Sequence, residues 1–207
     1  MSGSIDNAGA ILLAAGASTR LGQPKQLLPF RGGTLLGHVC RMARAAGCAP
    51  VVVVLGAEAA RCAAALRKEV PADNAMAQTV ECAAWVNGMG ASLKAGLRAL
   101  CDLAPACAEA VVLLCDQPLV TPDLLRALLH ARRTRGAPAA ACRYDGTVGP
   151  PAVFGREIFS EIAALPDAAG ARSLLTRHAL AGTLACVDFP DGTLDVDTPA
   201  DAARLRE

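Results

Sequence analysis

The segment A-G-A-I-L-L-A-A-G-A-S-T-R-L-G-Q-P-K, from Ala8 to Lys25, decides how the rest of the chain is interpreted. Residues 8–13 are continuously small or apolar, which is typical of a buried strand. The next three residues, 14–16, are too small to keep a phosphate away from the backbone N–H groups. Arg20 then suits bidentate contact with phosphate oxygens, and Lys25 provides a mobile point charge. The segment therefore predicts a strand followed by a loop that binds a nucleoside triphosphate.

Two better-known phosphate loops do not fit this spacing. A P-loop requires G-x-x-x-x-G-K-[ST], but Leu21 stands where its second glycine belongs. The dinucleotide motif G-x-G-x-x-G fails because Ser18 replaces its second glycine. A kinase-like protein or a dinucleotide-dependent oxidoreductase therefore loses its main support. An ordinary glycine-rich turn remains as the alternative, and the clustering of Arg20, Gly22 and Lys25 argues against it.

Composition limits the class of partner. A chain of 207 residues with 53% hydrophobic residues is long enough for one domain with a substantial core. Aromatic residues make up only 3% and the net charge is +1, so neither base stacking nor charge favours nucleic acid. Apolar runs are too short to span a bilayer. We expect a small-molecule partner, no nucleic acid or membrane, a disordered N-terminus at residues 1–7 and one domain at 8–207.

The nine cysteines predict neither a disulfide framework nor a metal site. Their number is odd and no C-x-x-C pair occurs. Most lie in apolar surroundings, where cysteine behaves as a small hydrophobe: Cys40, Cys62, Cys82, Cys115 and Cys186. Many free thiols indicate a reducing, cytoplasmic environment.

Strands alternate with helices along the chain. Strands are predicted at residues 8–13, 50–55, 79–82, 109–115, 139–142, 152–154 and 184–187. Helices are predicted at residues 35–46, 57–70, 91–103, 122–135, 156–165 and 172–180. Thr121 and Thr198 each stand before a proline, as capping residues at helix starts do. The pattern predicts an α/β fold: a single-domain, Rossmann-like, doubly wound, mostly parallel sheet with helices on both faces.

Candidate functional residues follow the predicted strands. Open α/β sheets bind ligands at the carboxyl ends of their strands. The loop at Gly16 follows the first strand, Gly56 the second, residues 87–92 the third and Asp116 the fourth. Packing alone would not place these residues together, so we expect one site at this edge.

The first motif resembles the signature of MobA-like NTP transferases, a family that includes molybdenum cofactor cytidylyltransferases and guanylyltransferases. The resemblance continues, in the expected order, at W-V-N-G-M-G-A-S-L (85–93), C-D-Q-P-L (115–119), G-P-P-A-V-F (149–154) and D-V-D-T-P-A-D (195–201). It covers nearly the whole chain. It implies a fold of the nucleotide-diphospho-sugar transferase type.

The resemblance also implies a reaction. A phosphate oxygen of the acceptor would attack the α-phosphorus of the nucleotide, with magnesium as cofactor, and pyrophosphate would leave. The form L-A-A-G with D-Q-P points to CTP and to molybdopterin as acceptor, whereas guanylyl relatives more often have L-A-G-G. A molybdoenzyme or its chaperone would be a partner.

The expected site residues fall into four groups. The catalytic residues are Arg20, Lys25 and Asp116. The nucleotide-binding residues are Leu13, Ala14, Ala15, Gly16, Arg20, Lys25, Gly56, Asn87, Gly88, Met89, Gly90 and Ser92, with Asn87 as the base and ribose contact. The acceptor pocket comprises Gln117, Pro118, Pro150 and Pro151. The metal ligands are Asp116 and Asp197.

Alternatives remain for several of these residues. Asp116 could be a turn residue before Pro118, and Asp197 could merely favour the following helix start, with Asp195 replacing it at the metal. Residues 87–92 could form a plain loop. Trp85 fits the core as well as a lid. No histidine has a convincing catalytic partner.

Two other functions remain open from sequence. One is a nucleotidyltransferase that uses another NTP with a sugar or alditol phosphate as acceptor. The other is a non-catalytic, nucleotide-binding regulatory protein that has kept the fold.

Overall fold

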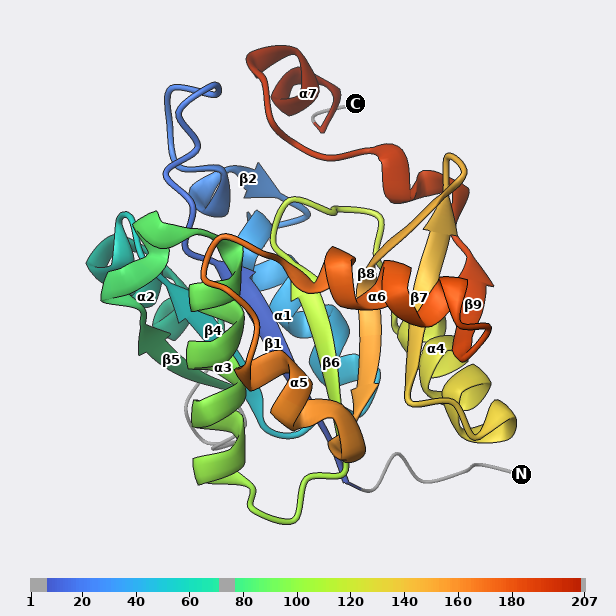
Figure 1. The fold of residues 1–207 in the computed structure, drawn as a ribbon. Coiled ribbons are helices and arrows are strands. Elements are labelled where there is room, and N and C mark those ends of the chain that lie inside the picture. The colour runs from blue at the N-terminus through green and yellow to red at the C-terminus, as the bar shows by residue number, and fades with distance from the viewer. Residues whose placement is uncertain (1–6, 71–76, 206–207) are drawn as a thin grey trace.

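The computed structural model describes residues 7–70 and 77–205, so the predicted disordered N-terminus falls, except for Asn7, outside the described residues. One seven-stranded sheet has the order β5-β4-β1-β6-β8-β7-β9 (Figure 1). Its strands are β1 (Ala8–Ala14), β4 (Val51–Leu55), β5 (Ala77–Glu81), β6 (Glu109–Leu114), β7 (Ala139–Tyr144), β8 (Thr147–Gly155) and β9 (Leu184–Asp188). Only β8 runs antiparallel to its neighbours in this sheet. The predicted mostly parallel α/β sheet is confirmed.

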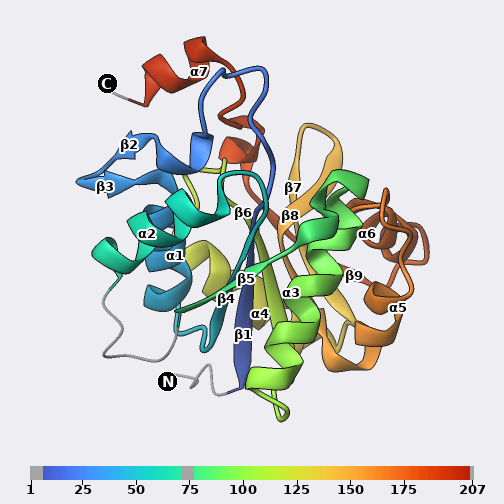
Figure 2. The same cartoon turned by 90° about the vertical axis from the view of Figure 1, so that its left-hand side faces the viewer.

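Helices cover both faces of the sheet (Figure 2). One face carries α1 (Leu35–Ala45), α2 (Ala59–Glu69) and α4 (Pro122–Arg135), and the other carries α3 (Met89–Leu103), α5 (Phe159–Ala163) and α6 (Ala171–Leu180). Alternate residues of β1 enter the two cores, with Leu12 in the first and Ile11 in the second. Burial on both faces explains why this strand is apolar throughout.

The central strand β1 lies where the strand order reverses. The chain proceeds from β1 to β4 and β5 on one side, and β6 then pairs with the other side of β1. In sheets of this kind, the crevice at such a reversal, beyond the carboxyl ends of the strands, binds the ligand. The loop after β1 and Asp116 after β6 both lie at this edge.

A small third core fixes the loop after β1 against the C-terminal segment. It contains Leu21, Leu28, Phe30, Leu35 and Val196. The hairpin of β2 (Pro29–Phe30) and β3 (Gly33–Thr34) forms part of it, and the C-terminal helix α7 (Pro199–Arg204) packs beside it through Ala202 (Figure 1). This hairpin was not predicted from the sequence.

Most helix boundaries agree with the prediction, and both predicted caps are confirmed. Thr121 accepts a hydrogen bond from the N–H of Leu124, and Thr198 forms a capping box with Asp201. Residues 156–165 are not one helix, because a 3-10 turn, η3 (Arg156–Ile158), precedes the short α5.

All nine cysteines lie in the described residues and are free, as expected. Cys186 is exposed, contrary to the apolar surroundings predicted for it, because it lies on the edge strand β9. None of the helices in residues 7–70 and 77–205 is both long enough and apolar enough to cross a membrane.

A buried ion pair fixes α4 against the amino end of β6. The carboxylate of Glu109 is only 4% exposed; it accepts a hydrogen bond from Arg132 at 2.9 Å and pairs with Arg133. We expect Glu109→Ala to lower the free energy of unfolding by about 1–3 kcal/mol, because Arg132 and Arg133 lose a hydrogen-bonded counter-charge while Arg132 keeps its pair with Glu157. Urea denaturation measures this change. The control Asp123→Ala, which breaks an exposed pair with Arg126, should cost less than about 1 kcal/mol. Equal losses in the two variants would contradict the prediction.

Candidate functional site

The loop after β1 is held by a buried glutamine. The Nε2 of Gln26 donates to the carbonyl oxygens of Ala14 and Gly16, both at 2.8 Å, and the side chain is 1% exposed. The backbone N–H of Lys25 donates to the Oγ of Ser18 at 3.1 Å. These hydrogen bonds hold the end of the loop, at Lys25 and Gln26, against its earlier residues. Sequence analysis did not predict this role of Gln26. The signal that could have indicated it is an amide side chain between Lys25 and an apolar run.

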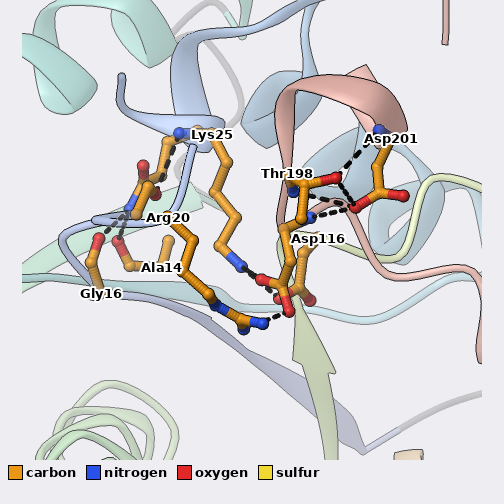
Figure 3. Close-up of polar contacts among 10 residues, drawn as sticks. Ala14, Gly16, Arg20, Lys25, Asp116, Thr198 and Asp201 are labelled. Carbon is orange, nitrogen blue, oxygen red and sulfur yellow. Dashed lines mark hydrogen bonds and ion pairs between the residues drawn. The ribbon is translucent and has the colours of Figure 1, made fainter. Parts of the chain in front are cut away.

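Two cations and two carboxylates meet beyond the loop. The Nζ of Lys25 lies 2.7 Å from the Oδ2 of Asp116 and 2.8 Å from the Oδ1 of Asp197. The guanidinium of Arg20 lies 2.6 Å from the Oδ2 of Asp197. Figure 3 shows the side chains of Arg20 and Lys25 extending toward the carboxylates. The structure therefore brings together all four of the charged residues expected at the site, as a paired cluster.

This cluster shifts the pKa values of its members. Burial disfavours the Lys25 ammonium, but the charge of Asp116 and the hydrogen bonds to both carboxylates outweigh it and raise the pKa of Lys25. The hydrogen bond from Lys25, with the charges of Lys25 and Arg20, lowers the pKa of Asp197. Desolvation, together with the negative charges of Asp116 and Asp197, raises the pKa of Asp195 to about 6. The carboxyl groups of Asp116, Asp195 and Asp197 thus share this edge of the sheet with the partly buried ammonium of Lys25.

The capping geometry separates the two roles considered for Asp197. Asp201 accepts from the N–H of Thr198 at 2.9 Å, and Thr198 caps α7 in return. The carboxylate of Asp197 instead contacts Lys25 and Arg20. Asp201 therefore forms the cap that Asp197 was considered to favour.

Two adjoining pockets open beside the cluster. The first, of about 240 Å³, is lined by Leu13, Ala14, Ala15, Gly16, Lys25, Gln26, Trp85, Gly88, Met89, Ser92, Leu114, Cys115 and Asp116. The second, of about 190 Å³, is lined by Gly16, Ser18, Thr19, Arg20, Lys25 and Asp197. They share Gly16 and Lys25, so they form one cleft with a largely apolar end and a charged end. We call these ends the apolar pocket and the charged pocket.

Three of the predicted nucleotide-binding residues do not line the apolar pocket. A Cβ added to Gly56 would lie 2.6 Å from the ring of Trp85 and 2.7 Å from the carbonyl oxygen of Ala15, so Gly56 packs beneath these residues. Asn87 donates through Nδ2 to Asp167 at 3.1 Å. Gly90 packs against the backbone of residues 166–169. Trp85 lines the apolar pocket, whereas Gly56, Asn87 and Gly90 are not among the described residues that line it.

The expected acceptor residues are buried. Gln117 and Pro118 follow β6, and Pro150 and Pro151 lie within β8. The Nε2 of Gln117 donates to the carbonyl oxygen of Pro150 at 3.2 Å. None of the four is among the described residues that line the apolar or charged pocket, so they support the site from behind.

A buried histidine supports the turn that contains Pro118. The Nε2 of His38 lies 3.1 Å from the carbonyl oxygen of Pro118, and burial lowers the pKa of His38. The neutral imidazole can donate this bond from Nε2, so His38 has a structural contact here.

The donor set at the cluster suits a hard divalent cation. The Oδ1 of Asp116 is buried and has no hydrogen-bond partner within the part of the chain that the structure describes. No three His, Cys, Asp or Glu side chains in that part are grouped to hold a metal. Magnesium is commonly bound by one or two carboxylates with phosphate oxygens and water. Asp116 and Asp197 therefore fit a metal that a bound phosphate helps to hold.

Comparison with known proteins gives the family. The family model described as the MobA-like NTP transferase domain matches residues 10–182. The nicotine blue oxidoreductase of Paenarthrobacter nicotinovorans is 36% identical over 204 residues, which cover 94% of each chain. The bifunctional protein GlmU of Geobacter sulfurreducens is 31% identical over 64% of this chain, which spans 26% of GlmU.

Solved structures agree. Rv0371c from Mycobacterium tuberculosis has a TM-score of 0.76 and 33% identity, over 96% of this chain and 97% of that chain. Its structure with manganese has a TM-score of 0.70, 34% identity and the same coverage. A nucleotidyl transferase from Methanothermobacter thermautotroptrophicus, with a TM-score of 0.78 and 22% identity over 97% and 96% of the two chains, shares the fold. The chain therefore belongs to the MobA-like NTP transferase domain family and is a nucleotidyltransferase.

Proposed function

We propose that this protein transfers CMP from CTP to a phosphate-bearing acceptor, molybdopterin, with magnesium and with release of pyrophosphate. The observation that supports this most is the cleft, in which an apolar pocket and a charged pocket meet at Gly16 and Lys25. The flat base of a nucleoside triphosphate suits the apolar pocket, and its phosphates suit the charged pocket.

The residues of the cleft would act by position and charge. A phosphate oxygen of the acceptor attacks the α-phosphorus, the bond to the β-phosphate breaks, and pyrophosphate takes the electron pair. The small side chains at Ala14–Gly16 would admit the phosphates, and Arg20 and Lys25 would neutralise the charge that develops on the leaving group. Lys25 would exchange one of its carboxylate contacts for a phosphate oxygen, because its ammonium is already held at the junction of the two pockets.

Asp116 and Asp197 would hold the magnesium ion. The ion, when bound, supplies positive charge between the carboxylates and the triphosphate. The buried, unpaired Oδ1 of Asp116 supports this role. The manganese complex of the Mycobacterium tuberculosis relative supports a divalent cation in this family.

The choice of substrates rests on the resemblance in sequence. L-A-A-G at residues 13–16 and D-Q-P at 116–118 favour CTP and molybdopterin. A structural neighbour, molybdopterin-guanine dinucleotide biosynthesis protein A of Archaeoglobus fulgidus, is 19% identical and supports the fold. The nine free cysteines support the cytoplasm as the place of action. A molybdoenzyme or its chaperone would receive the product.

Pyrophosphate release tests the proposal. Purified protein is given magnesium and CTP, GTP or UTP, each with molybdopterin or with a sugar or alditol phosphate. We expect release with CTP and molybdopterin, and CTP should win in competition with GTP. Preference for GTP would refute the cytidylyl assignment, and release with a sugar phosphate alone would change the acceptor. Nucleotide binding without release under any condition would favour a regulatory protein.

The Paenarthrobacter relative favours a second candidate function. Its name is that of an oxidoreductase, and it matches this chain over 94% of both lengths. We propose reduction of nicotine blue by an added two-electron reductant as this candidate, although the loop after β1 lacks the dinucleotide motif G-x-G-x-x-G. Protein-dependent loss of the dye's absorbance in the presence of the reductant would support it. Pyrophosphate release without such turnover would reject it.

We expect Lys25→Ala and Arg20→Ala each to reduce turnover on the order of a hundredfold to a thousandfold, because each removes a preorganised charge at the phosphates. Steady-state pyrophosphate release measures the effect, and thermal denaturation verifies that the variants fold. The control Arg126→Ala removes an arginine on α4 and should leave turnover unchanged. Turnover within about threefold of the parent in both site variants would reject the phosphate-loop assignment.

We expect Asp116→Asn nearly to abolish activity and Asp197→Asn to weaken it, because an amide keeps the size but loses the charge that binds a hard cation. Higher magnesium should partly restore Asp197→Asn. Magnesium titrations of pyrophosphate release measure both effects. A normal magnesium curve for Asp197→Asn would assign the second ligand to Asp195, and metal-independent turnover in the parent would reject the mechanism.

A further inference from the structure

We propose that Asp167 is a positioning residue that fixes one wall of the apolar pocket by holding the start of α3, and that Asn87 acts through Asp167. The inference rests on the proposed function in taking this pocket as the nucleotide site. Asp167 lies in the segment between α5 and α6, about eighty residues from the motif that it contacts. Sequence analysis assigned no role to this segment.

The backbone of Asp167 receives the first N–H groups of α3. Its carbonyl oxygen accepts from Gly90 at 2.9 Å and from Ala91 at 3.3 Å. The first N–H groups of a helix lack partners within the helix and attract anions. A protein carbonyl occupies these two N–H groups, so they are not free to bind a phosphate. This agrees with the Gly16 loop as the proposed phosphate site.

The side chain of Asp167 ties the same segment to α3 a second time. Its Oδ1 lies 2.6 Å from the Nζ of Lys94, and its Oδ2 accepts from the Nδ2 of Asn87 at 3.1 Å. Lys94 also donates to the carbonyl oxygen of Leu165 at 2.8 Å. The hydrogen bonds from Lys94 and Asn87 lower the pKa of Asp167, so the carboxylate stays charged and the contacts persist at neutral pH.

The glycines of N-G-M-G allow the two segments to touch. A Cβ at Gly88 would lie 2.6 Å from the carbonyl oxygen of Asp167, and one at Gly90 would lie 2.3 Å from that of Pro166. Gly88 also has a φ of +129°, which disfavours other residues. These glycines therefore serve a close backbone approach.

The start of α3, which Asp167 contacts, forms part of the wall of the apolar pocket. Gly88, Met89 and Ser92 line that pocket, and they belong to the start of α3 or immediately precede it. Met89 is 47% exposed and also lies close to Gly170. Loss of the contacts from Asp167 would free this wall to move. The affinity for nucleotide would then fall, while the charged cluster at Lys25 would be unchanged.

Kinetics of Asp167→Ala test this effect. We expect its KM for the nucleotide to rise about two- to fivefold with kcat unchanged, because the variant loses the partly exposed side-chain contacts to Lys94 and Asn87 but keeps the carbonyl contacts to Gly90 and Ala91. Trp85, the only tryptophan, lines the same pocket, so its fluorescence should report weaker nucleotide binding as well. Asp167→Glu should restore part of the affinity. The control Asp123→Ala should match the parent. An unchanged KM and an unchanged binding curve would overturn the proposal.

A double-mutant cycle decides how Asn87 acts. If Asn87 acts through Asp167, Asn87→Ala should raise KM in the parent and have no further effect in Asp167→Ala. A full and additive effect of Asn87→Ala in both backgrounds would mean that Asn87 contacts the nucleotide directly, and would overturn this part of the proposal.

Amide hydrogen exchange in the ligand-free protein separates this proposal from the proposed function. Peptides that cover residues 87–93 should exchange faster in Asp167→Ala than in the parent or in Asp123→Ala. Exchange at the parent's rate would overturn the positioning role whatever the activity. If the parent released no pyrophosphate with any nucleotide, the proposed function would fail, and the exchange experiment would still decide the role of Asp167.

Discussion

The ammonium group of Lys25 joins three parts of the chain that are far apart in sequence. It contacts Asp116 after β6 and Asp197 before α7, and its own backbone belongs to the loop after β1. Two neighbouring carboxylates repel each other, so a shared cation favours this arrangement when no metal is bound. The small core of Leu21 and Val196 joins two of these segments, the loop after β1 and the segment before α7. The position of the site thus depends on the two ion pairs of Lys25 and on this apolar packing.

Two glycines, which have no side chain, shape the walls of the cleft. Gly56 lets the Trp85 ring approach the carbonyl oxygen of Ala15, and Gly88 lets residues 167–168 approach the start of α3. A side chain at either position would move a wall of the apolar pocket. Gly56 and Gly88 therefore act by allowing close packing, and the buried Gln26 holds the loop after β1 through hydrogen bonds to Ala14 and Gly16.

Local signals in the sequence were sufficient for most of the fold. The apolar run of β1 predicted a strand buried on both faces, and Thr121-Pro122 predicted the start of α4. The β2–β3 hairpin was not predictable, because each strand has only two residues and depends on the third core for its burial. The predicted helix at 156–165 begins with a 3-10 turn, η3, which directly follows β8.

The sequence by itself determined the family, the strand-and-loop segment that places Arg20 and Lys25, and the identity of the four charged residues. Residue order and composition are enough for these conclusions, because strand burial and loop size act over a few neighbouring residues. Only the tertiary structure decided which groups face each other. It paired Lys25 with both carboxylates, turned Asn87 toward Asp167, and buried Gln117 behind the site. The contacts of Asn87 and Lys25 join residues 80 to 172 positions apart, about which local sequence patterns carry no information.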